Sequence, residues 1–315
     1  MIEMVGLTKQ FETVLAVDGI TLTVRPGEVL ALLGPNGAGK TTTVRMLSAV
    51  LRPTAGSARV AGFDVARQSL EVRQHVGVLT ESPGLYHRMS GQEYLEFFGE
   101  VRGMSVEARR ARIAYLAEWF GMSEVLDRRL GEYSRGMAQK VALMRTLLHD
   151  PAVLLLDEPT ATMDPQSARL VRDAILQLRS DQRTLIICTH NLMEAEELAD
   201  RIAIIRQGRI VAEGTSVELK RRLLGAPLME VRLAQPGVNG AVDLVARFAE
   251  VEASGPDVIR YRADHPMEAN PAILAALLSA GMKVFSLSEV PQSLESVYLR
   301  VVADGVENPR AGAAI

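Results

Sequence analysis

Cysteine is nearly absent from this sequence: Cys188 is the only one among 315 residues. A disulfide within the chain and a metal site built from several cysteines are therefore excluded. Cys188 ends the apolar run Leu185-Ile186-Ile187-Cys188, so we expect a small buried side chain there. A single cysteine is also compatible with a reducing compartment.

Long hydrophobic runs and an excess of charge are also missing. No stretch approaches the roughly 18 apolar residues that cross a bilayer, so any membrane role would require a second chain. The first residues, Met1 to Met4, lack a basic region followed by an apolar run, and we expect no secretion signal. The net charge is −3, and no nucleic-acid partner is expected from it.

Short apolar runs alternate with helical patterns in the first two thirds of the chain. Such runs are typical of buried strands, and their alternation with helices predicts an α/β fold with a parallel sheet covered on both faces. The runs lie at Val29–Leu33, Val153–Leu156 and Leu185–Cys188. Two further short runs flank Gln207-Gly208, which predicts a β-hairpin.

Two segments differ from this alternation. Residues from about 90 to 131 are rich in Glu, Arg, Leu and Ala, with breaks near Gly103 and Gly121, and are interpreted as a helical insert. The pattern changes again at Gly225, so we predict a first domain over residues 1–220 and a small C-terminal α+β domain over residues 225–303. Within the latter we expect strands at 229–233, 258–261 and 284–287, and helices at 241–248, 271–278 and 293–301. Residues 304–315 are rich in Gly, Ala and Pro and are expected to be disordered.

A glycine-rich loop follows the first buried strand. Its sequence is Gly34-Pro35-Asn36-Gly37-Ala38-Gly39-Lys40-Thr41-Thr42, which fits the pattern G-x-x-x-x-G-K-[ST]. Glycines let backbone N–H groups surround phosphate oxygens, and the positive end of the following helix faces the same charge. Lys40 can then reach the β- and γ-phosphates of ATP, and the Thr41 hydroxyl can bind Mg²⁺. A glycine-rich turn that matches by chance is the alternative, but the strand before and the helical pattern after favour the phosphate site.

Two carboxylates end the second apolar run. Asp157 suits coordination of Mg²⁺, commonly through water, and Glu158 is placed to act as a general base on an attacking water. Solvated acids at the end of a strand are a common alternative. The presence of the phosphate loop favours the functional interpretation.

Over residues 1 to about 220 the sequence resembles the ABC transporter ATPase family. Tyr133-Ser134-Arg135-Gly136-Met137-Ala138-Gln139 resembles the family's signature, Thr160 to Pro165 resembles its D-loop, and Thr189-His190 resembles its switch region. The resemblance implies a P-loop ABC ATPase domain with a mixed sheet core, an antiparallel β part and a helical insert.

The resemblance also implies roles for single residues. Ser134 and Gly136 would contact the γ-phosphate of ATP held by the opposite subunit, and Asp164 would lie along the subunit boundary. His190 would sense the γ-phosphate. Phe11 looks like the family's aromatic that stacks on adenine, and a core phenylalanine is the less favoured alternative.

The segment Glu289 to Leu299 looks like the ending of bacterial drug-exporter and sodium-exporter type ATPases, although an ordinary amphipathic helix is the alternative. The resemblance implies an exporter-type transport ATPase that works as a homodimer or as a pair of ABC subunits. It further implies a separately encoded membrane permease, and a location on the cytoplasmic face of the membrane. The insert and residues 81–86 would contact the permease.

Several positions depart from the family pattern. Glu81 stands where glutamine is frequent, which keeps an oxygen ligand for Mg²⁺ but loses an amide donor. Arg135, Met137 and Thr162 also differ, and we expect them to affect dimer closure or hydrolysis rate rather than ATP binding.

Two other functions remain open at the sequence level. One is a non-transport ABC ATPase, which would be expected to carry a long coiled coil or a second ATPase half. The other is a nucleotide-dependent regulator with little hydrolysis, against which Glu158 argues. The sequence does not reveal the cargo.

Overall fold

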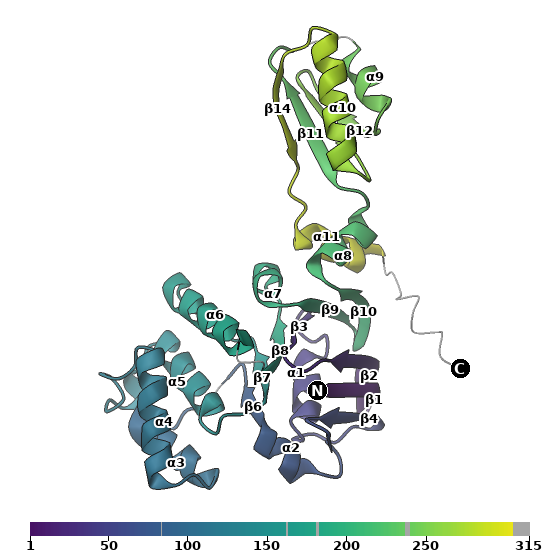
Figure 1. Cartoon of the computed structure of the whole chain (residues 1–315). Helices are drawn as coiled ribbons and strands as arrows, with labels where there is room; N and C mark the ends of the chain where they lie inside the picture. Colours follow the sequence, from purple (N-terminus) through teal and green to yellow (C-terminus); the bar gives the residue numbers. More distant parts are fainter. Residues whose placement is uncertain (83, 162, 181–182, 237–239, 305–315) are drawn as a thin grey trace. The chain divides into compact units, whose positions relative to one another are not determined.

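A computed structural model describes residues 1–304, apart from residues 83, 162, 181–182 and 237–239. The departure at Thr162 and the tail from residue 305 onward therefore lie outside the described residues. Asp304, expected at the start of that tail, instead ends helix α11 (Leu294–Asp304). The chain divides into two units, one from Met1 to Ser216 and one that begins at Val217 (Figure 1).

A six-stranded sheet in the order β10-β9-β3-β8-β7-β6 forms the centre of the first unit. Its strands pair in parallel except β10, which is antiparallel to β9. The three expected apolar runs form β3, β7 and β8, which are wholly buried because both faces of the sheet are covered. The strands are β3 (Val29–Leu33), β6 (Val76–Leu79), β7 (Val153–Asp157), β8 (Thr184–Thr189), β9 (Arg201–Arg206) and β10 (Arg209–Gly214).

An antiparallel sheet in the order β2-β1-β4-β5 packs beside it and shares an apolar core with α1. The elements are β1 (Ile2–Phe11), β2 (Val14–Val24), α1 (Lys40–Leu47), β4 (Ala55–Val60), β5 (Phe63–Asp64) and α2 (Ser69–His75). The sequence pattern did not indicate α2. That helix buries Val72 alone, which is too little for a helical periodicity to be visible.

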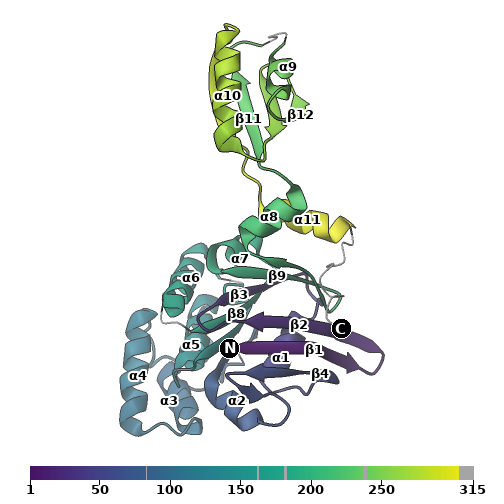
Figure 2. The same cartoon turned by 45° about the vertical axis from the view of Figure 1, so that its right-hand side comes forward.

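Helices cover the opposite side of the six-stranded sheet (Figure 2). The insert forms α3 and α4, and each helix ends just before a predicted break, at Gly103 (φ 73°) and Gly121 (φ 62°). The helices on this side are α3 (Gly91–Val101), α4 (Val106–Trp119), a 3-10 turn (Leu130–Glu132), α5 (Arg135–Leu147), α6 (Pro165–Ser180) and α7 (Leu192–Leu198).

The second unit is an antiparallel sheet in the order β12-β13-β11-β14, with α9 and α10 packed on one face. Val231, Tyr261 and Ile273 are wholly buried or nearly so in its core. The elements are α8 (Ser216–Leu224), β11 (Leu228–Leu233), α9 (Ala241–Ala246), β12 (Glu250–Ser254), β13 (Val258–Arg262), α10 (Pro266–Ser279), β14 (Val284–Glu289) and α11.

Two expectations for this unit were wrong in detail. Strand β12 was not expected, because its side chains are mostly exposed and carry no apolar alternation. Helix α10 begins at Pro266 rather than at Pro271. Proline suits the first helical position, and the N–H that Pro271 lacks would have bonded the carbonyl of Met267, an exposed residue. None of the described helices combines the length and apolar composition that a membrane span requires.

Candidate active site

The predicted phosphate loop, Glu81 and the paired carboxylates Asp157 and Glu158 meet at one edge of the six-stranded sheet. β3, β8, β7 and β6 are neighbours, and parallel strands end on the same side. Segments far apart in sequence therefore surround one hollow of about 330 Å³. Its lining residues are Pro35, Asn36, Gly37, Gly39, Lys40, Thr41, Thr42, Glu81, Asp157 and Glu158.

Two glycines of the loop, Gly34 and Gly39, are required by close backbone approach. A Cβ on Gly34 would lie 2.3 Å from the carbonyl oxygen of Ile205, and a Cβ on Gly39 would lie 2.5 Å from that of Ala16. Gly39 also has a φ of 107°, which L side chains rarely adopt. The β9–β10 hairpin, found where it was expected, adds a bond from the N–H of Gly208 to the carbonyl of Ala38 at 3.0 Å. The loop is thus held by strands on two sides.

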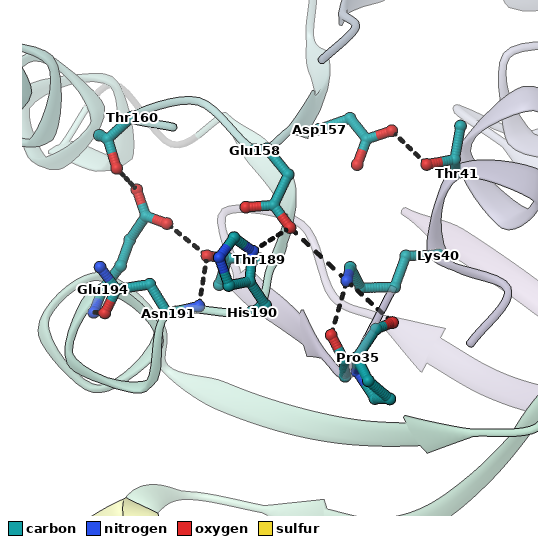
Figure 3. A network of polar contacts seen from close by, with 11 residues as sticks. Pro35, Lys40, Thr41, Asp157, Glu158, Thr160, Thr189, His190, Asn191 and Glu194 are labelled. Carbon is teal, nitrogen blue, oxygen red and sulfur yellow. Dashed lines mark hydrogen bonds and ion pairs between the residues drawn. The ribbon is translucent and has the colours of Figure 1, made fainter. Parts of the chain in front are cut away.

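Lys40 supplies a buried positive charge at the start of α1. Its Nζ donates to the carbonyl of Gly34 at 2.6 Å and to that of Pro35 at 3.3 Å, and lies 3.5 Å from Oε1 of Glu158 (Figure 3). The N-terminus of α1 adds free backbone N–H groups and the positive end of the helix dipole. The hollow is therefore suited to a polyanion such as a nucleotide phosphate chain.

Thr41 and Asp157 meet across the hollow, where the Thr41 hydroxyl donates to Oδ2 of Asp157 at 2.7 Å. Burial raises the pKa of Asp157, the charge of Glu158 raises it further, and the bond from Thr41 opposes both. A buried carboxylate beside a hydroxyl offers hard oxygen ligands, which Mg²⁺ prefers. Among the residues described, no cluster of three or more His, Cys, Asp or Glu could hold a metal ion. The pair fits a cation whose remaining ligands come from phosphate and water.

Glu158 adopts a backbone conformation that is rare for its residue type, with a φ of 51°. Such strain persists where the surrounding structure fixes the residue, and here the N–H of Glu158 donates to the carbonyl of Cys188 at 2.8 Å. The side chain then points to His190, whose Nδ1 lies 2.8 Å from Oε1 of Glu158. Cys188 itself is buried, as expected.

Ser134, Gly136 and Asp164 lie together but do not line the hollow. Ser134 precedes α5, and its hydroxyl accepts from the N–H of Met137 at 3.3 Å. Gly136 packs closely on the start of α6, because a Cβ there would lie 3.0 Å from Oγ of Ser167, with Oδ2 of Asp164 at 3.5 Å. Asp164 accepts backbone N–H bonds, and the bond from Ser167 is the main cause that lowers its pKa.

Phe11 ends β1 with 44% of its surface exposed, so it is not a core residue. Lys9 Nζ lies 5.0 Å from the centre of its ring. Of the departures, Met137 packs against the apolar core, Arg135 is exposed, and Glu81 is an exposed residue of the hollow. The core thus accounts for the methionine in the signature.

Glu194 joins this site through two hydrogen bonds that the sequence did not reveal. Glu194 accepts from the hydroxyls of Thr160 and Thr189 (Figure 3). Glu194 lies in the first turn of α7, where acidic residues are common on exposed surfaces and interact with the helix dipole. Its burial depends on the neighbouring loop, and no local pattern signals it.

Comparison with known proteins gives one consistent family. The family model described as "ABC transporter" matches residues 17–161. ABC transporter ATP-binding protein NatA of Bacillus subtilis is 40% identical over 68% of this chain and 89% of its own length. Daunorubicin/doxorubicin resistance ATP-binding protein DrrA of Streptomyces peucetius is 38% identical, over 95% of this chain and 91% of its own. Nod factor export ATP-binding protein I of Burkholderia lata is 36% identical, over 94% and 95%.

The architecture agrees with these relatives. A solved structure titled "Structure of ATP binding subunit of ABC transporter" superposes with a TM-score of 0.66 at 26% identity, covering 71% of this chain and 94% of that one. This family binds and hydrolyses ATP, and the phosphate loop, the paired carboxylates and His190 are assembled here in one site. The chain therefore belongs to the ATP-binding proteins of the ABC transporter family.

Proposed function

We propose that this chain hydrolyses ATP to drive export through a separately encoded membrane permease. The observation that carries the proposal is the contact of Glu158 with His190 at 2.8 Å, beside the buried Lys40 and the pair of Thr41 and Asp157. This arrangement combines a phosphate cradle, a cation site and a candidate base in one hollow.

Binding is assigned to the loop. The backbone N–H groups of residues 34–42 and the ammonium of Lys40 hold the β- and γ-phosphates. Thr41 and Asp157 hold Mg²⁺, with Glu81 as a further oxygen ligand, and the bound ion supplies positive charge to the phosphate oxygens. Phe11, exposed at the end of β1, stacks on the adenine ring.

Hydrolysis is assigned to Glu158 and His190. A water oxygen attacks the γ-phosphorus while the bond from that phosphorus to the β–γ bridging oxygen breaks, and ADP leaves. Glu158 accepts the proton of the attacking water, and His190 contacts the γ-phosphate. Lys40 neutralises the developing negative charge on the phosphate oxygens.

Pairing of two subunits completes the site. Ser134, Gly136 and Asp164 lie together at the start of α5 and α6, outside the hollow of their own chain. The free N–H groups at the start of α5 are suited to a γ-phosphate held by a second subunit. ATP thus joins two subunits head to tail, and its hydrolysis loosens them.

The direction of transport and the partner follow from the relatives. Two of them are named for drug resistance and for Nod factor export, which favours export over import. Because no described helix is suited to span a bilayer, the pathway belongs to a separate permease. The chain then works at the cytoplasmic face of the membrane, and the insert of α3 and α4 contacts the permease.

The Glu158→Gln substitution tests this assignment. It keeps the size of the side chain but removes the base, so we expect turnover of Mg-ATP to fall by about 10²- to 10⁴-fold, with ATP still bound. ATP should then hold two subunits together, and size-exclusion chromatography with light scattering would detect the dimer. Turnover by this variant at the wild-type rate would contradict the role of Glu158.

A second measurement addresses the partner. Purification of the tagged full-length chain from membranes should recover a protein with several predicted membrane spans, and this recovery should depend on the insert. Recovery of ribosomes or nucleic acid in its place would contradict the transport assignment.

A further inference from the structure

Glu194 is a buried carboxylate that bonds two loops at once. It lies in the first turn of α7 and is 2% exposed. Its Oε1 accepts from the Thr160 hydroxyl at 2.7 Å, and its Oε2 accepts from the Thr189 hydroxyl at 2.6 Å. Each oxygen thus receives a short bond from a different segment.

The two threonines flank the reacting residues. Thr160 follows Glu158 by two positions, at the start of the loop that leads to Asp164, and Thr189 directly precedes His190. These contacts also include the start of α7, because the Thr189 hydroxyl accepts from the N–H of Asn191 at 3.0 Å and Asn191 caps that helix. The segments that bear Glu158 and His190 are therefore fixed to one carboxylate and to one helix end.

Burial of the Glu194 carboxylate costs free energy. Burial raises its pKa, the bonds from Thr189 and Thr160 lower it, and the charge of Glu158 raises it again. An apolar side chain of similar volume avoids the cost of burying a carboxylate. The use of both oxygens as hydrogen-bond acceptors explains why a carboxylate stands here.

We propose that Glu194 is a positioning residue for hydrolysis, which holds the Glu158 and His190 segments in mutual register through Thr160 and Thr189. This inference rests on the proposed role of Glu158. Glu194 is not among the described residues that line the hollow, and its carboxylate accepts from Thr160 and Thr189. We therefore expect it to act on the rate of the chemical step and to leave the phosphate loop unchanged. A small displacement of a reacting group is enough to slow an enzyme strongly.

The test compares full-length variants by kcat for Mg-ATP and by Kd for ATP. Glu194→Ala is expected to lower kcat by about 10- to 100-fold while the Kd stays within about 2-fold. Glu194→Gln keeps one oxygen acceptor and should recover part of the loss. The matched control is Glu197→Gln on the same helix, where the exposed carboxylate pairs with Arg172 at 3.0 Å, and it should leave both constants unchanged.

If Glu194→Ala is unstable, the Thr160→Val and Thr189→Val variants test the same proposal. Thr160→Val removes one bond to Glu194, and Thr189→Val removes the other together with the bond that Thr189 accepts from Asn191, each with little change in volume. The double variant should approach the loss of Glu194→Ala. An unchanged kcat in the double variant overturns the proposal, as does a parallel loss of kcat and ATP affinity that tracks the fraction of unfolded protein. The Glu158→Gln variant distinguishes a failure of this inference from a failure of the proposed function. If Glu158→Gln is inactive and the Thr160→Val/Thr189→Val variant has a normal kcat, the role of Glu194 is contradicted and the role of Glu158 stands.

Discussion

His149 lies outside the hollow, in an environment that is unusual for a titratable side chain. It follows α5, its Nε2 lies 3.2 Å from the carbonyl of Val76, and its Nδ1 is buried with no hydrogen-bond partner among the described residues. Burial and the positive charge of Arg102 lower the pKa of His149 from 6.5 to about 4. The folded chain thus favours the neutral imidazole.

We predict that His149 makes folding less favourable in acid. Above its ordinary pKa of 6.5, the imidazole is neutral in both states and its contribution is fully present. As the pH falls from there towards 4, the unfolded chain binds a proton that the folded chain does not, so stability is lost. As the pH falls over this range, the free energy of unfolding of His149→Gln should decrease by about 1 to 3 kcal/mol less than that of the wild type.

Urea unfolding at about pH 7 and about pH 4.5 would measure the effect. His87→Gln is the matched control, because His87 is exposed in the same unit. An equal pH dependence in His149→Gln and the wild type would contradict the prediction.

At the scale of elements, helix α3 shows how local sequence fixes a boundary. The Ser90 hydroxyl accepts from the N–H of Glu93 at 3.1 Å, and Oε2 of Glu93 accepts from the N–H of Ser90 at 2.8 Å. This capping box follows from the pattern S-x-x-E and starts the insert where the composition changes. The helix then carries Tyr94 and Leu95 into the core.

Loss of this cap should be measurable. Ser90→Ala removes one acceptor from the first turn of α3, and we expect it to lower the free energy of unfolding by about 1 kcal/mol. Ser105→Ala at the start of α4 offers a comparison, because Ser105 accepts from the N–H of Ala108 without a reciprocal bond in the described structure. Thermal or urea unfolding of both variants would give the two costs, and no loss in Ser90→Ala would show that tertiary packing alone holds the helix.

At the scale of the whole molecule, the chain has separate apolar cores. Two clusters lie in the first unit, and a third cluster, which contains Tyr261 and Ile273, lies in the second. Trp119 is the only tryptophan of the chain and packs in the first unit. Its fluorescence therefore reports on one unit, while far-ultraviolet circular dichroism reports on both.

We predict that Ile273→Ala destabilises the second unit alone. Ile273 is wholly buried, so its truncation should cost about 2 to 5 kcal/mol in that unit. Circular dichroism should show an earlier unfolding phase, while the Trp119 transition and the Kd for ATP stay unchanged. Met267→Ala is a suitable control, since Met267 is 89% exposed on the same helix. A shift of the Trp119 transition would mean that the units unfold together.

Much of the site could be predicted because its chemistry is local in sequence. The phosphate loop needs consecutive backbone groups, so residues 34–42 carry their own pattern. Asp157 and Glu158 are marked by the apolar strand that they end. The small C-terminal unit was less predictable, because β12 has almost no buried face and α10 starts before Pro271.

The sequence by itself determined the phosphate loop, the positions of the three apolar strands and the family, because each depends on short runs of consecutive residues. Only the tertiary structure decided which side chains meet. His190 reaches Glu158 and Thr160 reaches Glu194 across 32 and 34 positions of the chain. The physical reason is that β7 and β8 pair as parallel neighbours, so the loops after them share one edge of the sheet.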